Sequence, residues 1–175
     1  MLKKIAIGFV IIIGLILALA ATKPDSFSMQ RTITIKAPPE KIMALIVDFR
    51  NWPSWSPWEK LDPAMQRTYA GAPNGKGAVY AWTGNSDVGQ GRMEITDYAA
   101  PTSATIKLEF IEPVAMTNMT QFVLTPQGEI TNVTWRMNGP MPFITKVMSV
   151  FTSMDALVGK DFEKGLSQLK VAAEK

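Results

Sequence analysis

The feature that most constrains this fold is a series of strand-like segments between residues 66 and 138. Apolar and polar residues alternate in these segments, which recur about every ten residues at 66–70, 77–83, 90–98, 103–111, 116–125 and 130–138. Such alternation places the apolar side chains on one face of a strand. Turn residues such as Gly, Pro and Asn separate the segments, so the connections are short. Six consecutive strands with short connections predict an antiparallel meander.

Further elements flank this meander. Residues 31–36 alternate like a strand, and apolar residues at helical spacing predict a helix over about 39–49. Residues 50–66, rich in Trp and Pro, have no regular period and are interpreted as a loop or a second short helix. Residues 144–173 predict one long helix with an apolar stripe, formed by Met148, Phe151, Met154, Val158, Phe162, Leu166 and Leu169.

The stripe and the sheet must bury their apolar faces together. The sequence therefore predicts an α+β fold, in which a curved antiparallel sheet wraps around a long C-terminal helix. Such a sheet can leave a gap between itself and the helix. Gly159 and Gly165 interrupt the stripe, and predict a bend or close packing there.

The N-terminal segment is apolar on every face. Residues 5–21 contain only apolar residues and Gly, after Lys3 and Lys4. This length suits both a short membrane span and the hydrophobic region of a signal peptide. Two interpretations follow: an uncleaved anchor, or a signal cleaved near Ala20, after a small-x-small pattern. In both, the basic end stays in the cytoplasm, and the domain lies on the periplasmic or extracytoplasmic side, anchored or released.

The expected organisation is an N-terminal apolar helix followed by one domain. Residues 1–22 are predicted to be the transmembrane anchor or signal peptide, residues 23–28 a linker, and residues 29–175 the globular domain. The expected membrane contact is made through residues 5–21.

Composition excludes several kinds of chemistry. The chain has no Cys and no His, which excludes disulfides and thiolate nucleophiles and removes the commonest general base and metal ligand. The acidic residues are dispersed and form no evident acid/base pair, so we expect no metal, no cofactor and no identifiable catalytic residue. The net charge is +3 without a basic cluster, so nucleic acid is not an expected partner. The oligomeric state is left open.

Four stretches resemble the START-like (SRPBCC) superfamily, in its polyketide cyclase/dehydrase and lipid transport branch. They are ITIKAPPEKI (33–42), FRNWPSWSPW (49–58), GAVYAWTGN (77–85) and TNVTWRM (131–137). The resemblance covers about residues 28–173. It implies the helix-grip fold and a domain that binds apolar ligands, although only some members of the superfamily catalyse a reaction. No catalytic residue of the superfamily can be matched here.

The resemblance and the strand alternation together give candidate cavity residues. They share the inward faces of the strands or the helical stripe: Tyr80, Trp82, Met93, Leu108, Phe110, Phe122, Trp135, Met137, Phe151, Met154, Val158 and Phe162. A filled core would have the same pattern. Trp52, Trp55 and Trp58 recur every three residues and are candidates for the cavity mouth, or for a corner that packs the first helices against the sheet.

The leading hypothesis is non-catalytic binding of a lipid-like or other hydrophobic small molecule in an internal cavity. One alternative is a cyclase- or hydrolase-type enzyme that acts on an apolar substrate in the same cavity, which would need a carboxylate or a Tyr inside it. A second alternative is a protein-interaction domain with a filled core.

Overall fold

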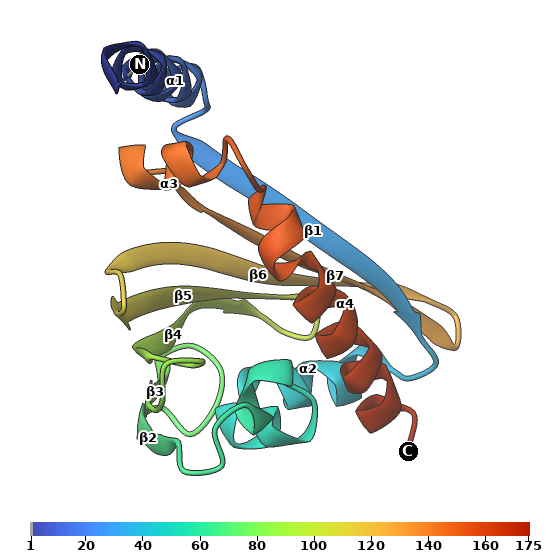
Figure 1. Cartoon of the computed structure of the whole chain (residues 1–175). Helices are drawn as coiled ribbons and strands as arrows, with labels where there is room; N and C mark the ends of the chain where they lie inside the picture. Colours follow the sequence, from blue (N-terminus) through green and yellow to red (C-terminus); the bar gives the residue numbers. More distant parts are fainter. Residues whose placement is uncertain (1) are drawn as a thin grey trace.

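The computed structural model describes residues 2–175 (Figure 1). The elements before the meander are α1 (Leu2–Ala21), β1 (Ser26–Ile35), α2 (Pro39–Val47) and two short 3-10 helices, η1 (Phe49–Ser54) and η2 (Pro57–Lys60). The meander contains β2 (Gln66–Gly71), β3 (Ala78–Thr83), β4 (Gln90–Ala99), β5 (Ser103–Glu112), β6 (Met116–Gln127) and β7 (Ile130–Pro140). The chain ends in α3 (Phe143–Met148) and α4 (Met154–Ala173).

The strands form one seven-stranded antiparallel sheet in the order β1-β7-β6-β5-β4-β3-β2. The predicted meander is confirmed, and β1 joins it beside the last strand, with Ser26 opposite Pro140 and Ile35 opposite Thr131. β1 begins inside the segment expected to be a linker, because Phe27 is buried in the core. The connection between α1 and the sheet is therefore only residues 22–25.

The long helix α4 lies across the concave face of the curved sheet (Figure 1). Phe162, Leu166 and Leu169 are buried on one side of this helix, as the apolar stripe predicts. The α+β helix-grip architecture is thus confirmed. α2 packs against α4, β5 and β6, and η1 packs against α2 and β3, so these short helices complete one end of the core.

The prediction of one continuous C-terminal helix is wrong. α3 ends at Met148 and α4 begins at Met154. Ser153 caps α4, because its side chain accepts a hydrogen bond from the Ala156 N–H at 3.1 Å, and Asp155 follows in the first turn. A serine cap and an early acid are a helix start signal that overrides the continuing apolar stripe.

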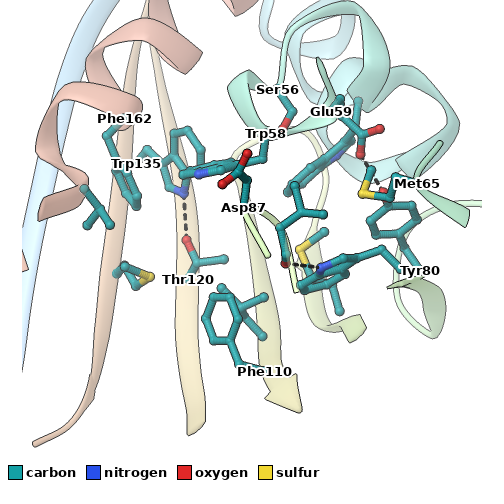
Figure 2. Close-up of a pocket in the computed structure, with 17 residues that line it drawn as sticks. Ser56, Trp58, Glu59, Met65, Tyr80, Asp87, Phe110, Thr120, Trp135 and Phe162 are labelled. Atoms are coloured by element: carbon teal, nitrogen blue, oxygen red, sulfur yellow. Dashed lines mark hydrogen bonds between the residues drawn. The ribbon is translucent and has the colours of Figure 1, made fainter. Parts of the chain in front are cut away.

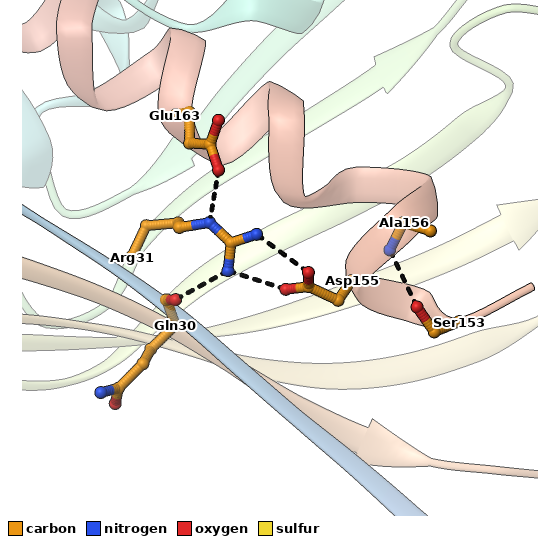
Figure 3. Close-up of polar contacts among 6 residues, drawn as sticks. All are labelled: Gln30, Arg31, Ser153, Asp155, Ala156 and Glu163. Carbon is orange, nitrogen blue, oxygen red and sulfur yellow. Dashed lines mark hydrogen bonds and ion pairs between the residues drawn. The ribbon is translucent and has the colours of Figure 1, made fainter.

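Arg31 of β1 holds the first turns of α4 against the sheet (Figure 3). Its guanidinium donates hydrogen bonds to Asp155 at 2.7 and 3.0 Å and to Glu163 at 2.7 Å. Gly159 makes this approach possible, because a Cβ there would lie 2.4 Å from the Arg31 guanidinium. Gly165 does the same further along, where a Cβ would lie 2.9 Å from the Trp135 ring. Of the two interpretations of these glycines, close packing is therefore confirmed.

α1 leaves its apolar side chains exposed. Ile5, Phe9 and Val10 are each more than half exposed, and only the end of the helix, at Ala20, is buried. α1 is the one described helix that is long and apolar enough to cross a membrane. Its length and position near the N-terminus suit a membrane anchor or a signal sequence.

Candidate functional site

A cavity of about 260 Å³ lies between α4 and the concave face of the sheet (Figure 2). Its walls come from α4, β3 to β7, the β3–β4 turn and the segment around η2. The side chains that line it are Trp52, Ser56, Trp58, Glu59, Met65, Tyr80, Trp82, Asp87, Val88, Met93, Leu108, Phe110, Thr120, Trp135, Met137, Val158 and Phe162. Aromatic and aliphatic groups dominate this set, so the space favours an apolar occupant.

Most of the predicted cavity residues lie in this wall. They are Tyr80, Trp82, Met93, Leu108, Phe110, Trp135, Met137, Val158 and Phe162. Phe122 is fully buried behind the wall, and Met154 packs against the core without lining the cavity. Phe151 does not belong to the wall, because it lies in the turn between α3 and α4 and is 72% exposed. The break in the helix removes Phe151 from the phase of the stripe.

The three tryptophans of the first loop have different positions. Trp52 and Trp55 are buried, and their indole N–H groups donate to the backbone carbonyls of Ile46 and Leu45, each at 2.9 Å. These bonds fix η1 against α2, so the packed-corner interpretation describes Trp55. Trp52 and Trp58 line the cavity as well.

Trp135 forms the centre of an aromatic stack. Its ring lies 4.1 Å from Phe162 and 4.8 Å from Phe122, measured between centroids, and both contacts are stacked. Its indole N–H donates to the Thr120 hydroxyl at 2.7 Å, and that hydroxyl donates to the Arg136 carbonyl at 2.9 Å. The polar atoms of this wall are therefore satisfied within the protein.

Trp82 is fixed in a similar way near the β3–β4 turn. Its indole N–H donates to the Val88 carbonyl at 2.9 Å. A Cβ at Gly91 would lie 2.5 Å from the Trp82 ring, so the glycine gives this ring room against β4. Trp82 and Trp135 thus both present ring carbons rather than free donors to the cavity.

One group of polar residues lies at the edge of the cavity, around Glu59. The Glu59 side chain is only 4% exposed. It accepts a hydrogen bond from the Tyr80 hydroxyl at 2.6 Å and one from Arg67 at 2.7 Å, and Arg67 also donates to the Glu59 carbonyl. Burial first, and then the hydrogen bond to Glu59, raise the pKa of the Tyr80 phenol, so it stays protonated. The same carboxylate raises the pKa of Arg67.

Sequence reasoning identified Tyr80 but missed Glu59. Glu59 follows Trp58 in a segment without periodicity, and its partners come from β2 and β3, so no spacing connects the three residues. The only signal was an acidic residue within the Trp- and Pro-rich segment. Chemically, a carboxylate and a phenol beside a cavity can orient a hydroxyl or amine of a ligand, or exchange a proton with it.

The comparisons with known proteins agree with this architecture. Residues 26–174 match the family model described as "Polyketide cyclase / dehydrase and lipid transport". The chain belongs to this family. No functionally curated protein matches it in sequence.

Solved structures of several different proteins have the same fold as this chain. The di-domain ARO/CYC BexL from the BE-7585A biosynthetic pathway has a TM-score of 0.64 at 12% identity, covering 91% of this chain and 53% of BexL. Major latex-like protein 151 from Panax ginseng has a TM-score of 0.61 at 13% identity, and the match covers 87% of this chain and 100% of the ginseng protein. Protein CV1439 from Chromobacterium violaceum has a TM-score of 0.59 at 13% identity, and the match covers 87% of this chain and 99% of CV1439. At these identities the likeness shows the fold alone.

Among residues 2–175 of this family member, no three carboxylates gather closely enough to hold a metal ion. The candidate site consists of the apolar cavity with the Glu59–Tyr80 pair at its edge. Besides its apolar walls, the site has the carboxylates of Glu59 and Asp87, the phenol of Tyr80 and the hydroxyls of Ser56 and Thr120.

Proposed function

We propose that this domain binds a hydrophobic small molecule or lipid-derived group in the cavity between α4 and the sheet. The observation that carries the proposal is the cavity itself, which is lined by buried and half-buried aromatic and aliphatic side chains rather than filled by them. The buried indole donors of Trp82 and Trp135 already have partners. An apolar ligand would therefore enter without leaving a polar group of this wall unpaired.

The size of the cavity limits the ligand. Its volume of about 260 Å³ is near the lower end of the range of roughly 300–1,000 Å³ that small-molecule pockets have. This favours a single acyl chain or a small cyclic molecule over a complete phospholipid. Burial of the ligand contributes about 25 cal/mol per Å² of apolar area before the entropic cost of binding is subtracted.

A cavity-filling variant tests this proposal. Val158→Phe places a larger side chain on the α4 wall, and Val171→Phe adds the same group at a 58% exposed position on the same helix. Residues 24–175 are titrated with cis-parinaric acid and with Nile red, and energy transfer from tryptophan is recorded. We expect saturable binding by the wild type and by Val171→Phe, and weakened binding by Val158→Phe. Equal signals from all three proteins would contradict binding in this cavity.

The proposed location of the domain depends on whether α1 is retained. We propose that α1 anchors the chain in a membrane and that the domain lies on the periplasmic or extracytoplasmic side. Cleavage near Ala20 would instead release the domain. Mass spectrometry of the intact mature protein distinguishes the two, because cleavage removes the first twenty or so residues.

A second candidate is an enzyme of the cyclase or hydrolase type, acting on an apolar substrate in the same cavity. It is favoured by Glu59 and Tyr80, which line the cavity and share a hydrogen bond of 2.6 Å. BexL, which has the same fold, is described as an ARO/CYC protein. If the domain is an enzyme, Glu59→Gln should abolish turnover of a bound substrate and leave its binding intact. If it only binds, the bound molecule should be recovered unchanged from the wild type and from Glu59→Gln.

The third candidate, a protein-interaction domain with a filled core, has less support. The inward faces of the sheet and α4 would then meet without a gap, whereas residues of both, such as Met137 and Val158, line a cavity.

A further inference from the structure

One end of the domain carries a cluster of exposed apolar side chains. The strand register brings the start of β1, the end of β7 and the β5–β6 turn to the same end of the sheet, since Ser26 lies opposite Pro140 and Phe110 opposite Met116. α3 follows β7 there, and α1 packs beside α3 (Figure 1). The exposed residues of this apolar end are Ile111, Val114, Phe143, Ile144, Met148 and Phe151.

The core does not explain this cluster. α3 has no buried residue, and its Phe143, Ile144 and Met148 are each more than half exposed. Phe151, in the turn that follows, is 72% exposed. A concentration of large apolar side chains on a surface marks a region that contacts another apolar phase.

The chain itself indicates which phase that is. α1 is apolar around its whole circumference and is long enough to cross a membrane. Only residues 22–25 connect α1 to β1, and four residues extend over at most about 14 Å. If α1 spans a bilayer, this short connection keeps the apolar end at the headgroup region, which is itself only about 5–8 Å thick on each side.

The cavity reaches the surface near the same end. Gln90 pairs with Glu112, so the β3–β4 turn lies beside the end of β5. The lining residues Val88, Phe110 and Val158 are only partly buried, and they come from this turn, from the end of β5 and from the beginning of α4. The mouth of the cavity therefore opens close to the apolar end.

We propose that the apolar end inserts into the bilayer surface beside α1, and that the cavity exchanges its ligand directly with the membrane. The ligand would then be a membrane-resident apolar molecule that does not cross water on its way to the site. This inference rests on the proposed function, because it assumes that the cavity binds such a molecule and that α1 is retained in the membrane.

The insertion is testable by site-specific labelling, because the chain has no cysteine. Phe151→Cys and Glu129→Cys each provide one labelling site, the second at the exposed β6–β7 turn at the opposite end of the sheet. The full chain is labelled with an environment-sensitive fluorophore and reconstituted into phosphatidylcholine vesicles that contain a nitroxide-labelled phosphatidylcholine. We expect strong quenching at position 151 and little at position 129. Equal weak quenching, or a disulfide-linked dimer of the unlabelled Phe151→Cys protein showing that a second copy covers this end, would overturn the insertion.

The exchange is tested by loading the full chain with cis-parinaric acid from donor vesicles. Phe151→Glu should slow loading by about tenfold or more, because a charged group replaces a large apolar side chain at the bilayer surface. Val171→Glu, at an exposed apolar position near the opposite end of α4, should load at the wild-type rate. Unchanged loading by Phe151→Glu would overturn direct exchange.

A parallel titration separates this inference from the function on which it rests. When cis-parinaric acid is added from solution to detergent-solubilised protein, Phe151→Glu and wild type should bind it with equal affinity. If neither binds, the proposed function fails. If both bind and the loading rates from vesicles are equal, only the membrane exchange fails.

Discussion

Replacement of Phe162 tests how tightly α4 is packed on the sheet. Phe162 is 2% exposed, its ring is stacked on Trp135 with centroids 4.1 Å apart, and it meets the Trp58 ring edge-on at 6.3 Å. Phe→Ala in a closed core costs about 3–5 kcal/mol. One side of this ring already borders the cavity, so fewer packing contacts are lost. We therefore expect Phe162→Ala to destabilise the domain by about 3 kcal/mol, the lower end of that range.

The assay is urea unfolding of residues 24–175, followed by far-UV circular dichroism and tryptophan fluorescence. The protein has to be free of ligand, because a bound ligand would add its own stabilisation. Lys164→Ala is the matched control on an exposed face of α4 and should change the free energy of unfolding by no more than about 0.5 kcal/mol. Equal effects at the two positions, or a loss below about 1 kcal/mol for Phe162→Ala, would refute the assigned helical phase and packing.

Three further predictions concern the supports of the fold. Gly165→Ala should destabilise the domain by about 1–3 kcal/mol because the new Cβ would lie 2.9 Å from the Trp135 ring. Helix propensity alone would instead stabilise the variant, so a higher free energy of unfolding in urea would contradict close packing. Arg31 lowers the pKa of Asp155, so their pair stabilises the fold above the unfolded pKa of about 3.8 and loses this effect as the pH falls through the lower folded pKa. Asp155→Asn should therefore lower the Tm at neutral pH and have a diminishing effect below that value, whereas a constant difference would exclude the pair as the cause. Without residues 1–21 the chain should remain soluble and unfold cooperatively, because α1 is largely exposed, and an insoluble fragment would assign α1 to the core.

Much of the fold could be predicted from the sequence because it depends on periodicity. Alternation in β7 predicted that Val133, Trp135 and Met137 share the buried face, and all three are buried. The stripe on the last helix likewise placed Phe162 and Leu166 inward. In each case burial of one face fixes the orientation, whatever the neighbouring elements are.

The remaining features depend on competition or on contacts between distant segments. In the sequence, the apolar stripe continues through Phe151. In the structure, Ser153 caps a new helix through one local hydrogen bond, so the helix is interrupted although the periodic pattern is not. The association of Glu59 with Arg67 and Tyr80 joins three elements that no sequence spacing relates. Alternation also does not distinguish a cavity from a filled core, because both require the same apolar faces.

The space beside Trp135 is proposed to hold an apolar molecule. The most direct measurement is mass spectrometry of the small molecules that copurify with the full chain after gentle detergent extraction. Wild type is compared with Val158→Phe, which fills the cavity, and with Val171→Phe, which adds the same group on the surface. We expect one class of apolar molecule in wild type and in Val171→Phe, and its depletion from Val158→Phe. The same molecules in equal amounts from all three proteins would contradict the claim.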